Sequence, residues 1–156
     1  MTQAENWIEQ LPQAVLDYLD GRRLEEVECI VSDMPGISRG KAMPAAKFAR
    51  SDNMFLPDSL YYQTITGGWA DFGSEERFTD PDMVLTPDFS TVTAAPWAAD
   101  TTIQIIHNVD DQQGKPVPFA PRNVLKSVVE QYAELGLKAV VAPELEFYLV
   151  EPNIDP

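Results

Sequence analysis

Residues 27–44 read VECIVSDMPGISRGKAMP, a stretch that predicts a β-hairpin. Val27, Cys29 and Val31 are spaced two residues apart and therefore share one face of a strand, which that spacing suits for burial. Residues 33–36 then supply turn chemistry, because aspartate, proline and glycine favour tight turns. We therefore expect two paired strands near the start of the chain.

The segments on both sides of this hairpin predict further helices and strands. Apolar residues recur at helical spacing over residues 5–19, where Pro12 can break the helix into two pieces. After the hairpin we expect a short helix at 44–50, a long loop at 51–82 and two short strands or one bent strand at 83–97. A strand at 101–110, a helix at 121–135 and a strand or bent strand pair at 138–150 follow. This order of elements favours the α+β fold class.

Three parts are expected along the chain. Residues 1–22 form an N-terminal helical segment, residues 23–113 an α+β domain, and residues 114–156 the beginning of a second domain. The turn-rich segment DDQQGKP separates the last two parts. The helix and strand that follow it have too little surface to fold alone.

Composition and charge exclude several classes of function. The chain has 156 residues and a net charge of −14, so its surface repels nucleic-acid phosphates and anionic lipids. Cys29 is the only cysteine, which excludes an internal disulfide. No apolar run approaches the roughly 20 residues of a membrane span, and the acidic start lacks the pattern of a secretory signal. We expect a cytoplasmic protein without nucleic-acid or membrane partners.

The segment APELEFYLV, residues 142–150, places Glu144 and Glu146 two residues apart on a predicted strand. Side chains at this spacing share a face, with Cα atoms about 6.5 to 7 Å apart. Two such carboxylates can bind Mg²⁺ or Mn²⁺, which prefer oxygen ligands. The alternative is a solvent-facing pair that only adds solubility, and spacing alone favours that alternative.

A few other residues could take part in chemistry, but a structural interpretation is favoured for each. His107 is the only histidine, so no second ring can complete a metal site with it, and Cys29 fits the pattern of a core strand. Arg39 and Lys41 could bind a phosphate, although such a pair on a hairpin is usually solvated or salt-bridged. Gly40 between them is typical of a bulge or a close backbone approach.

Four stretches, in the right order, resemble the amino-terminal part of the glutamine synthetase family. The hairpin is similar to the pattern D-x-x-G-x-x-R-G-K-x-x-P, which here spans residues 33–44. Residues 82–91 resemble D-M-x-L-x-P-D-x-S-T, residues 121–125 resemble P-R-x-x-L, and residues 142–150 resemble G-P-E-x-E-F-F-L. The last two stretches look closest to the branch of γ-glutamylputrescine and γ-glutamylpolyamine synthetases.

This resemblance implies a β-grasp-like N-terminal domain, followed by the first helix and strand of a glutamine synthetase-type catalytic barrel. It implies that Glu144 and Glu146 are ligands to two different divalent ions, Mg²⁺ or Mn²⁺. It also implies an ATP-dependent ligase in which glutamate forms an acyl phosphate that an amine or ammonium attacks. In that family the first domain completes the active site of the next subunit, so a homo-oligomeric, dodecamer-type ring is implied.

One loop departs from the family pattern. Glutamine synthetases resemble F-D-G-S-S at the start of this loop, with an aspartate that helps to bind and deprotonate ammonium. Here the region reads TITGGWADFG, with Thr64 or Thr66 where the acid would fall. Thr64 and Thr66 are therefore the candidate residues of the amine site. The loss of the acid favours an amine larger than ammonium, although Asp71 could substitute after a shift of the loop.

The chain stops at Pro156, before the remaining metal ligands and the nucleotide-binding residues of such enzymes. We therefore expect the 156-residue polypeptide alone to be inactive as a ligase. The alternative is a short, non-catalytic β-grasp module that associates with full-length relatives as a binding or assembly partner.

Overall fold

The computed structural model describes residues 7–50, 54–70 and 80–152. The predicted hairpin is present in it as strands β1 (Glu26–Ser32) and β2 (Ser38–Pro44), which pair antiparallel. Val27, Cys29 and Val31 are almost completely buried on one face of β1, as their alternation predicts.

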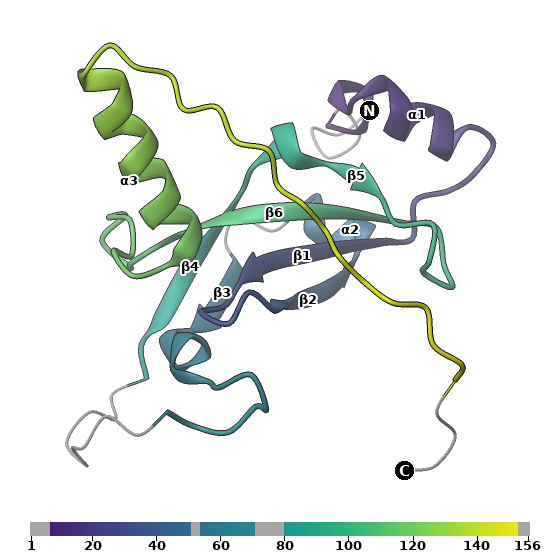
Figure 1. Ribbon diagram of the computed structural model, residues 1–156. Helices are drawn as coiled ribbons and strands as arrows, with labels where there is room; N and C mark the ends of the chain where they lie inside the picture. The colour runs from purple at the N-terminus through teal and green to yellow at the C-terminus, as the bar shows by residue number, and fades with distance from the viewer. Residues whose placement is uncertain (1–6, 51–53, 71–79, 153–156) are drawn as a thin grey trace.

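Strand β6 (Thr102–Asp110) is the centre of a six-stranded sheet (Figure 1). β1 runs parallel to the first half of β6, whereas β4 (Asp82–Pro87) pairs antiparallel with its second half. The short strand β5 (Thr93–Ala94) also pairs with β6, and β3 (Met54–Pro57) extends the sheet beyond β4. The strand order is β2-β1-β6-β4-β3, which with the helices gives the predicted mixed α+β fold.

Short helices flank this sheet. The N-terminal helix is split at Pro12, because proline cannot donate the backbone hydrogen bond that would continue a helix. The two pieces are η1 (Ile8–Gln10) and α1 (Gln13–Leu19). The described residues also form the helices α2 (Ala45–Phe48), η2 (Asp58–Tyr62), η4 (Phe89–Thr91) and α3 (Pro121–Glu134).

The buried core joins the sheet to the N-terminal helices. Ile103 and Ile105 of β6 are completely buried, and Val15 of α1 is buried in the same cluster. Burial of these side chains supplies the main driving force for folding, at about 1.5 to 3 kcal/mol each. The core therefore holds the sheet and α1 together, and it reaches Val109 at the far end of β6 and Ala120 just before α3.

The prediction of a long loop at residues 51–82 is wrong at residues 54–62 and at residue 82, whereas residues 63–70 contain only turns and an isolated bridge. β3 and η2 lie inside it, and β4 begins at its last residue. Met54 and Leu56 of β3 are buried where they pair with Leu85 and Met83 of β4. A strand of four residues shows too few alternations of buried and exposed positions to be recognised from the sequence alone. The parts of the predicted loop at 51–53 and 71–79 lie outside the described residues.

The prediction of a strand at residues 138–150 is also wrong. Residues 137–152 contain neither helix nor strand, and the side chains of Leu145 and Phe147 are 91% and 78% exposed. A strand needs a neighbour for its backbone N–H and C=O groups, and within the described residues no strand pairs with this segment. The alternating pattern indicates which side chains would share a face, but it does not show whether another strand is present to pair with the backbone.

Helix α3 (Figure 1) has the predicted amphipathic pattern, yet its apolar side chains are exposed. Only Asn123, in its first turn, is buried. The exposed apolar side chains of the helix are Val124, Leu125, Val128, Val129 and Tyr132. In the described part of the chain, no helix has both the length and the apolar character that crossing a bilayer requires.

Candidate functional site

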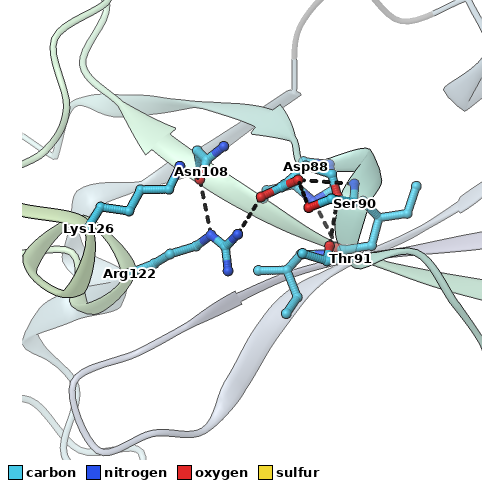
Figure 2. A network of polar contacts seen from close by, with 9 residues as sticks. Asp88, Ser90, Thr91, Asn108, Arg122 and Lys126 are labelled. Carbon is cyan, nitrogen blue, oxygen red and sulfur yellow. Dashed lines mark hydrogen bonds and ion pairs between the residues drawn. The ribbon is translucent and has the colours of Figure 1, made fainter. Parts of the chain in front are cut away.

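Polar side chains from the first turns of α3 attach this helix to the sheet (Figure 2). Arg122 donates from Nε to the side-chain oxygen of Asn108 on β6, at 3.1 Å, and from Nη2 to Oδ2 of Asp88, at 2.5 Å. Lys126 donates to the same oxygen of Asn108 at 2.6 Å. The planar guanidinium thus joins α3 to two segments at once, which the single ammonium of a lysine cannot reproduce.

The turn that follows Asp88 orients its carboxylate toward Arg122 by hydrogen bonds. It accepts hydrogen bonds from the hydroxyl and the backbone N–H of Ser90, at 2.6 and 3.1 Å. The Ser90 hydroxyl contributes most to holding the pKa of Asp88 below its usual value, and Arg122 adds to this effect against the opposing effect of burial. Asp88 is therefore ionised at neutral pH and attracts the guanidinium.

The first turn of α3 is also fixed by the buried side chain of Asn123. Its Nδ2 donates to the carbonyl oxygens of Val109, at 2.6 Å, and Val117, at 3.0 Å. Each of these oxygens also accepts a backbone N–H, from Val117 and Ala120 respectively, so the amide of Asn123 adds a second bond to each. The N-terminus of α3 is therefore held rigidly at the end of β6.

The contact between Asp88 and Arg122 unites two of the motifs that the sequence singles out, PDFST and PRNVL. Neither motif by itself predicts that the two segments touch. The available signal was the presence of one acidic and one basic residue at defined positions of the two patterns. Their pairing could not be read from local periodicity, because the residues are far apart in the chain.

The basic residues of the hairpin motif have structural partners, which confirms the favoured interpretation. Arg39 pairs with the fully buried Asp33, with 2.8 Å between Nε and Oδ2, and the backbone N–H of Ile37 also donates to Asp33 at 2.7 Å. Lys41 donates to the carbonyl oxygen of Phe55 on β3, at 2.7 Å. These bonds brace the turn and the edge of the sheet.

Residues 62–70 form a closed hairpin tip beyond η2. Gln63 pairs with Trp69 across the tip, and the backbone N–H of Thr64 donates to Gly68 at 2.8 Å. The hydroxyl oxygens of Thr64 and Thr66 lie 3.1 Å apart. The structure therefore brings the two candidate residues of the amine site together. Their role there stays a prediction.

Asp71, the acid that could replace the aspartate of the family loop, lies outside the described residues. Residues 63–70 contain no charged side chain. The tip as described therefore offers hydroxyl, amide and apolar groups to a ligand, but no carboxylate.

Glu144 and Glu146 lie on the exposed segment 137–152. Because this segment is not a strand, the predicted common face of the two carboxylates stays a prediction. Among the described residues, no group of three or more histidine, cysteine, aspartate or glutamate side chains is placed to hold a metal ion. The pair supplies oxygen donors suited to Mg²⁺ or Mn²⁺, but fewer than the usual six ligands.

The two remaining candidates are buried core residues. Nδ1 of His107 lies 3.0 Å from the carbonyl oxygen of Ile105, while Nε2 is buried without a hydrogen-bond partner among the described residues. Burial is the main cause that lowers the pKa of His107, and burial raises the pKa of the Cys29 thiol to about 12. Both side chains are therefore neutral parts of the core at pH 7, as the sequence indicates.

Comparisons with known proteins agree with these motifs. The family model of the glutamine synthetase catalytic domain matches residues 118–155. The crystal structure of a glutamine synthase homologue superposes with a TM-score of 0.62 at 23% identity, and the match covers 73% of this chain and 28% of that one. This likeness concerns the fold alone.

Two relatives match nearly the whole chain. Glutamate–isopropylamine ligase of a Pseudomonas species is 31% identical over 148 residues, which make up 90% of this chain and 31% of that protein. γ-Glutamylputrescine synthetase PuuA of Escherichia coli K12 is 29% identical over 168 residues, covering 99% of this chain and 35% of that protein. The chain belongs to the glutamine synthetase family of ligases, and it spans about a third of the length of these two relatives.

Proposed function

We propose that this chain is part of an ATP-dependent ligase that joins the γ-carboxylate of glutamate to an amine. The main support is the occurrence of four family motifs in order, two of which are joined by the ion pair of Asp88 and Arg122. The names of the two relatives state isopropylamine and putrescine as acceptors. An organic amine is therefore the proposed substrate class, with ammonium as the alternative.

In the proposed reaction, an oxygen of the γ-carboxylate attacks the γ-phosphorus of ATP, and ADP leaves. The amine nitrogen then attacks the acyl carbon, inorganic phosphate leaves, and the nitrogen loses a proton. Bound Mg²⁺ or Mn²⁺ supplies neutralisation of the phosphate charge. Glu144 and Glu146 are the residues of this chain that would hold these ions, since their carboxylate oxygens are donors of the required type.

The remaining described residues have positioning roles in this proposal. Arg122 and Asp88 fix the start of α3, and the segment with the two glutamates follows this helix along the chain. The tip with Thr64 and Thr66 faces the amine. We further propose that residues 23–113 form the β-grasp-like domain and that the tip completes the site of the next subunit in a homo-oligomeric ring.

The 156-residue polypeptide alone is proposed to be inactive. Its described residues do not assemble a metal-binding group of three or more ligands, and it spans about a third of the relatives that it matches. Glutamate- and amine-dependent release of ADP by the purified 156-residue polypeptide would contradict this part of the proposal.

The test uses the protein as its own cells produce it. Its intact mass is measured first, followed by ADP release in the presence of glutamate with ammonium, isopropylamine or putrescine. A mass well above 17.4 kDa and ADP release that depends on both glutamate and an amine would support the ligase. A mass near 17.4 kDa without ADP release would overturn it and favour the non-catalytic assembly module.

A further inference from the structure

His107 lies on the central strand β6 with one ring nitrogen that makes no hydrogen bond. The residue is 1% exposed, and its Nδ1 lies 3.0 Å from the carbonyl oxygen of Ile105. Nε2 is buried and has no hydrogen-bond partner in the part of the chain that the structure describes. Burial of this kind keeps the imidazole neutral, because a charged ring would lose its hydration without full compensation.

An aromatic cluster packs against this histidine. The ring of Phe48, on α2, meets the imidazole at 89°, with 6.5 Å between the ring centroids. Phe48 also lies 5.2 Å from Trp7 and 6.5 Å from Phe89 on η4, and the last two rings are 6.2 Å apart. Trp7, Phe48 and Phe89 therefore form one aromatic cluster that is connected to His107 through Phe48.

The aromatic cluster attaches the first described residues to the rest of the protein. Trp7 is the cap residue of η1, and Pro12 separates η1 from α1. Helix α1 has an anchor of its own, since Val15 is almost completely buried in the core. Trp7 and Ile8, in contrast, are only half-buried. Residues 7–10 can therefore detach locally while α1 stays in place.

The same cluster is the side from which water can reach His107 at least cost. Phe89 is 48% exposed, and Trp7 and Phe48 are half-buried. Strand β6, in contrast, is hydrogen-bonded to β1 and to β4. These strands cannot separate without losing backbone hydrogen bonds, whereas the rings are held to one another by packing alone. Hydration of a charged imidazole therefore requires the aromatic cluster to open.

Charged groups contribute nothing to the protonation of His107 among the described residues. Burial is the main cause that lowers the pKa of His107, and the carbonyl oxygens of Ile105 and Ile30 oppose it only in part. No side-chain charge is among these causes. The titratable and charged groups on the elements around the histidine are Cys29, Asp33 and Arg39 of the β1–β2 hairpin, Lys47 of α2, Tyr61 of η2, and Asp88 with Arg122 beside η4. Access of water thus controls the charge of the ring.

We propose that His107 is a pH-sensitive switch for residues 7–10: the neutral imidazole supports the aromatic cluster, and protonation opens the cluster and releases Trp7 with η1. In the released state water reaches the ring, which then titrates near its ordinary pKa of 6.5. The released state therefore binds the proton more tightly and is favoured as the pH falls below 6.5. This inference does not depend on the proposed function.

The experiment measures hydrogen exchange in the protein as its own cells produce it, at about pH 7.5 and 5.5 with a series between them. Exchange in peptides over residues 7–12, α1 and β6 is corrected for the intrinsic effect of pH. Protection of residues 7–12, where the amide of Leu11 donates to Ile8, is expected to fall about tenfold while β6 stays protected. His107→Gln is expected to remove this dependence on pH.

Two phenylalanine variants test the role of the cover. Phe89→Ala removes one ring of the aromatic cluster and lets water reach the imidazole, so the midpoint of the transition is expected to move up toward pH 6.5. Phe55→Ala removes an exposed ring from β3, outside the cluster, and is expected to leave the midpoint unchanged.

Three results would overturn the inference. The first is protection of residues 7–12 that does not depend on pH, or that depends on it equally in the parent protein and in His107→Gln. The second is an equal loss of protection in β6, which would indicate global unfolding. The third is an unchanged midpoint in Phe89→Ala, which decides the question even if His107→Gln does not fold. Ligase activity is not measured, so the proposed function is tested separately.

Discussion

Gly40 occupies a position on β2 where no side chain fits. An added Cβ would lie 1.9 Å from the carbonyl oxygen of Cys29 and 3.1 Å from the Cα of Ile30, both on the paired strand β1. Main-chain atoms of a paired strand cannot move aside without disturbing its hydrogen bonds. The sequence-based interpretation of Gly40 as a close backbone approach is confirmed.

Gly40→Ala is therefore expected to destabilise the protein by about 2 to 3 kcal/mol, the usual cost of overpacking. The free energy of unfolding is measured by urea titration and circular dichroism. Gly68→Ala serves as the matched control, because its nearest contact is the Thr64 hydroxyl at 3.5 Å, and it is expected to change stability by less than about 0.5 kcal/mol. Equal stability of the two variants would contradict the argument.

His107 is expected to make stability depend on pH. Its pKa is lowered from 6.5 in the folded state, mainly by burial, so below pH 6.5 the unfolded chain binds a proton that the folded chain does not. The free energy of unfolding therefore falls as the pH decreases below 6.5, by up to about 1.4 kcal/mol per pH unit. Above pH 6.5 this histidine does not affect stability. Urea titrations at pH 7.5 and 5.5 measure the loss. His107→Gln should show a smaller loss, and an identical loss would refute the assignment.

Helix α3 depends on polar contacts at one end, because its apolar face packs against no described element. Arg122 and Asp88 are only 26% and 22% exposed, so water screens their attraction in part. The ion pair therefore contributes modestly to stability. Its main effect is to orient α3 relative to the sheet. The bonds of Asn123 to the end of β6 act in the same place.

A double-mutant cycle with Asp88→Asn and Arg122→Gln is expected to give a coupling energy of about 1 kcal/mol in urea unfolding. Hydrogen exchange of the α3 amides should increase in both single variants. Arg122→Lys tests the geometry, since it keeps the charge but cannot contact Asp88 and Asn108 together, and it is expected to lose most of the coupling. A coupling energy close to zero would show that the contact does not hold the helix.

The molecule as a whole combines a strongly acidic surface with two exposed apolar regions, the face of α3 and residues 137–150. Large exposed apolar patches mark surfaces that associate. The net charge of −14 opposes close approach of two copies, and salt screens this repulsion. The balance between the two effects controls the behaviour of the 156-residue polypeptide in solution.

The 156-residue polypeptide is expected to self-associate at micromolar concentration, and more strongly at 0.3 M than at 0.03 M salt, both taken as order-of-magnitude conditions. Sedimentation velocity over a concentration series measures this. Leu125→Glu and Val129→Glu should weaken the association, because they place charges on the exposed apolar face. Ser127→Glu adds the same charge elsewhere on α3 and should have less effect. A monomer at all concentrations would contradict the expectation.

Local sequence pattern was sufficient for much of this fold. The hairpin of β1 and β2, the break at Pro12, the strand β6 and the helix α3 all follow from periodicity and turn chemistry within a few residues. Strand spacing also led to Glu144 and Glu146 as candidate site residues, whereas Thr64 and Thr66 are candidates only through the resemblance to the family loop. Their proposed roles come from the resemblance to a family, since spacing alone left a structural alternative open.

Contacts between distant parts of the chain decided the rest. β3 exists because Met54 and Leu56 meet β4, and residues 138–150 have no strand because no described strand lies beside them. The meeting of Asp88 with Arg122 likewise depends on how β4 and α3 are placed around β6. Periodicity specifies which faces of a segment are apolar, whereas a hydrogen-bonded or charged partner is supplied only when the chain has folded.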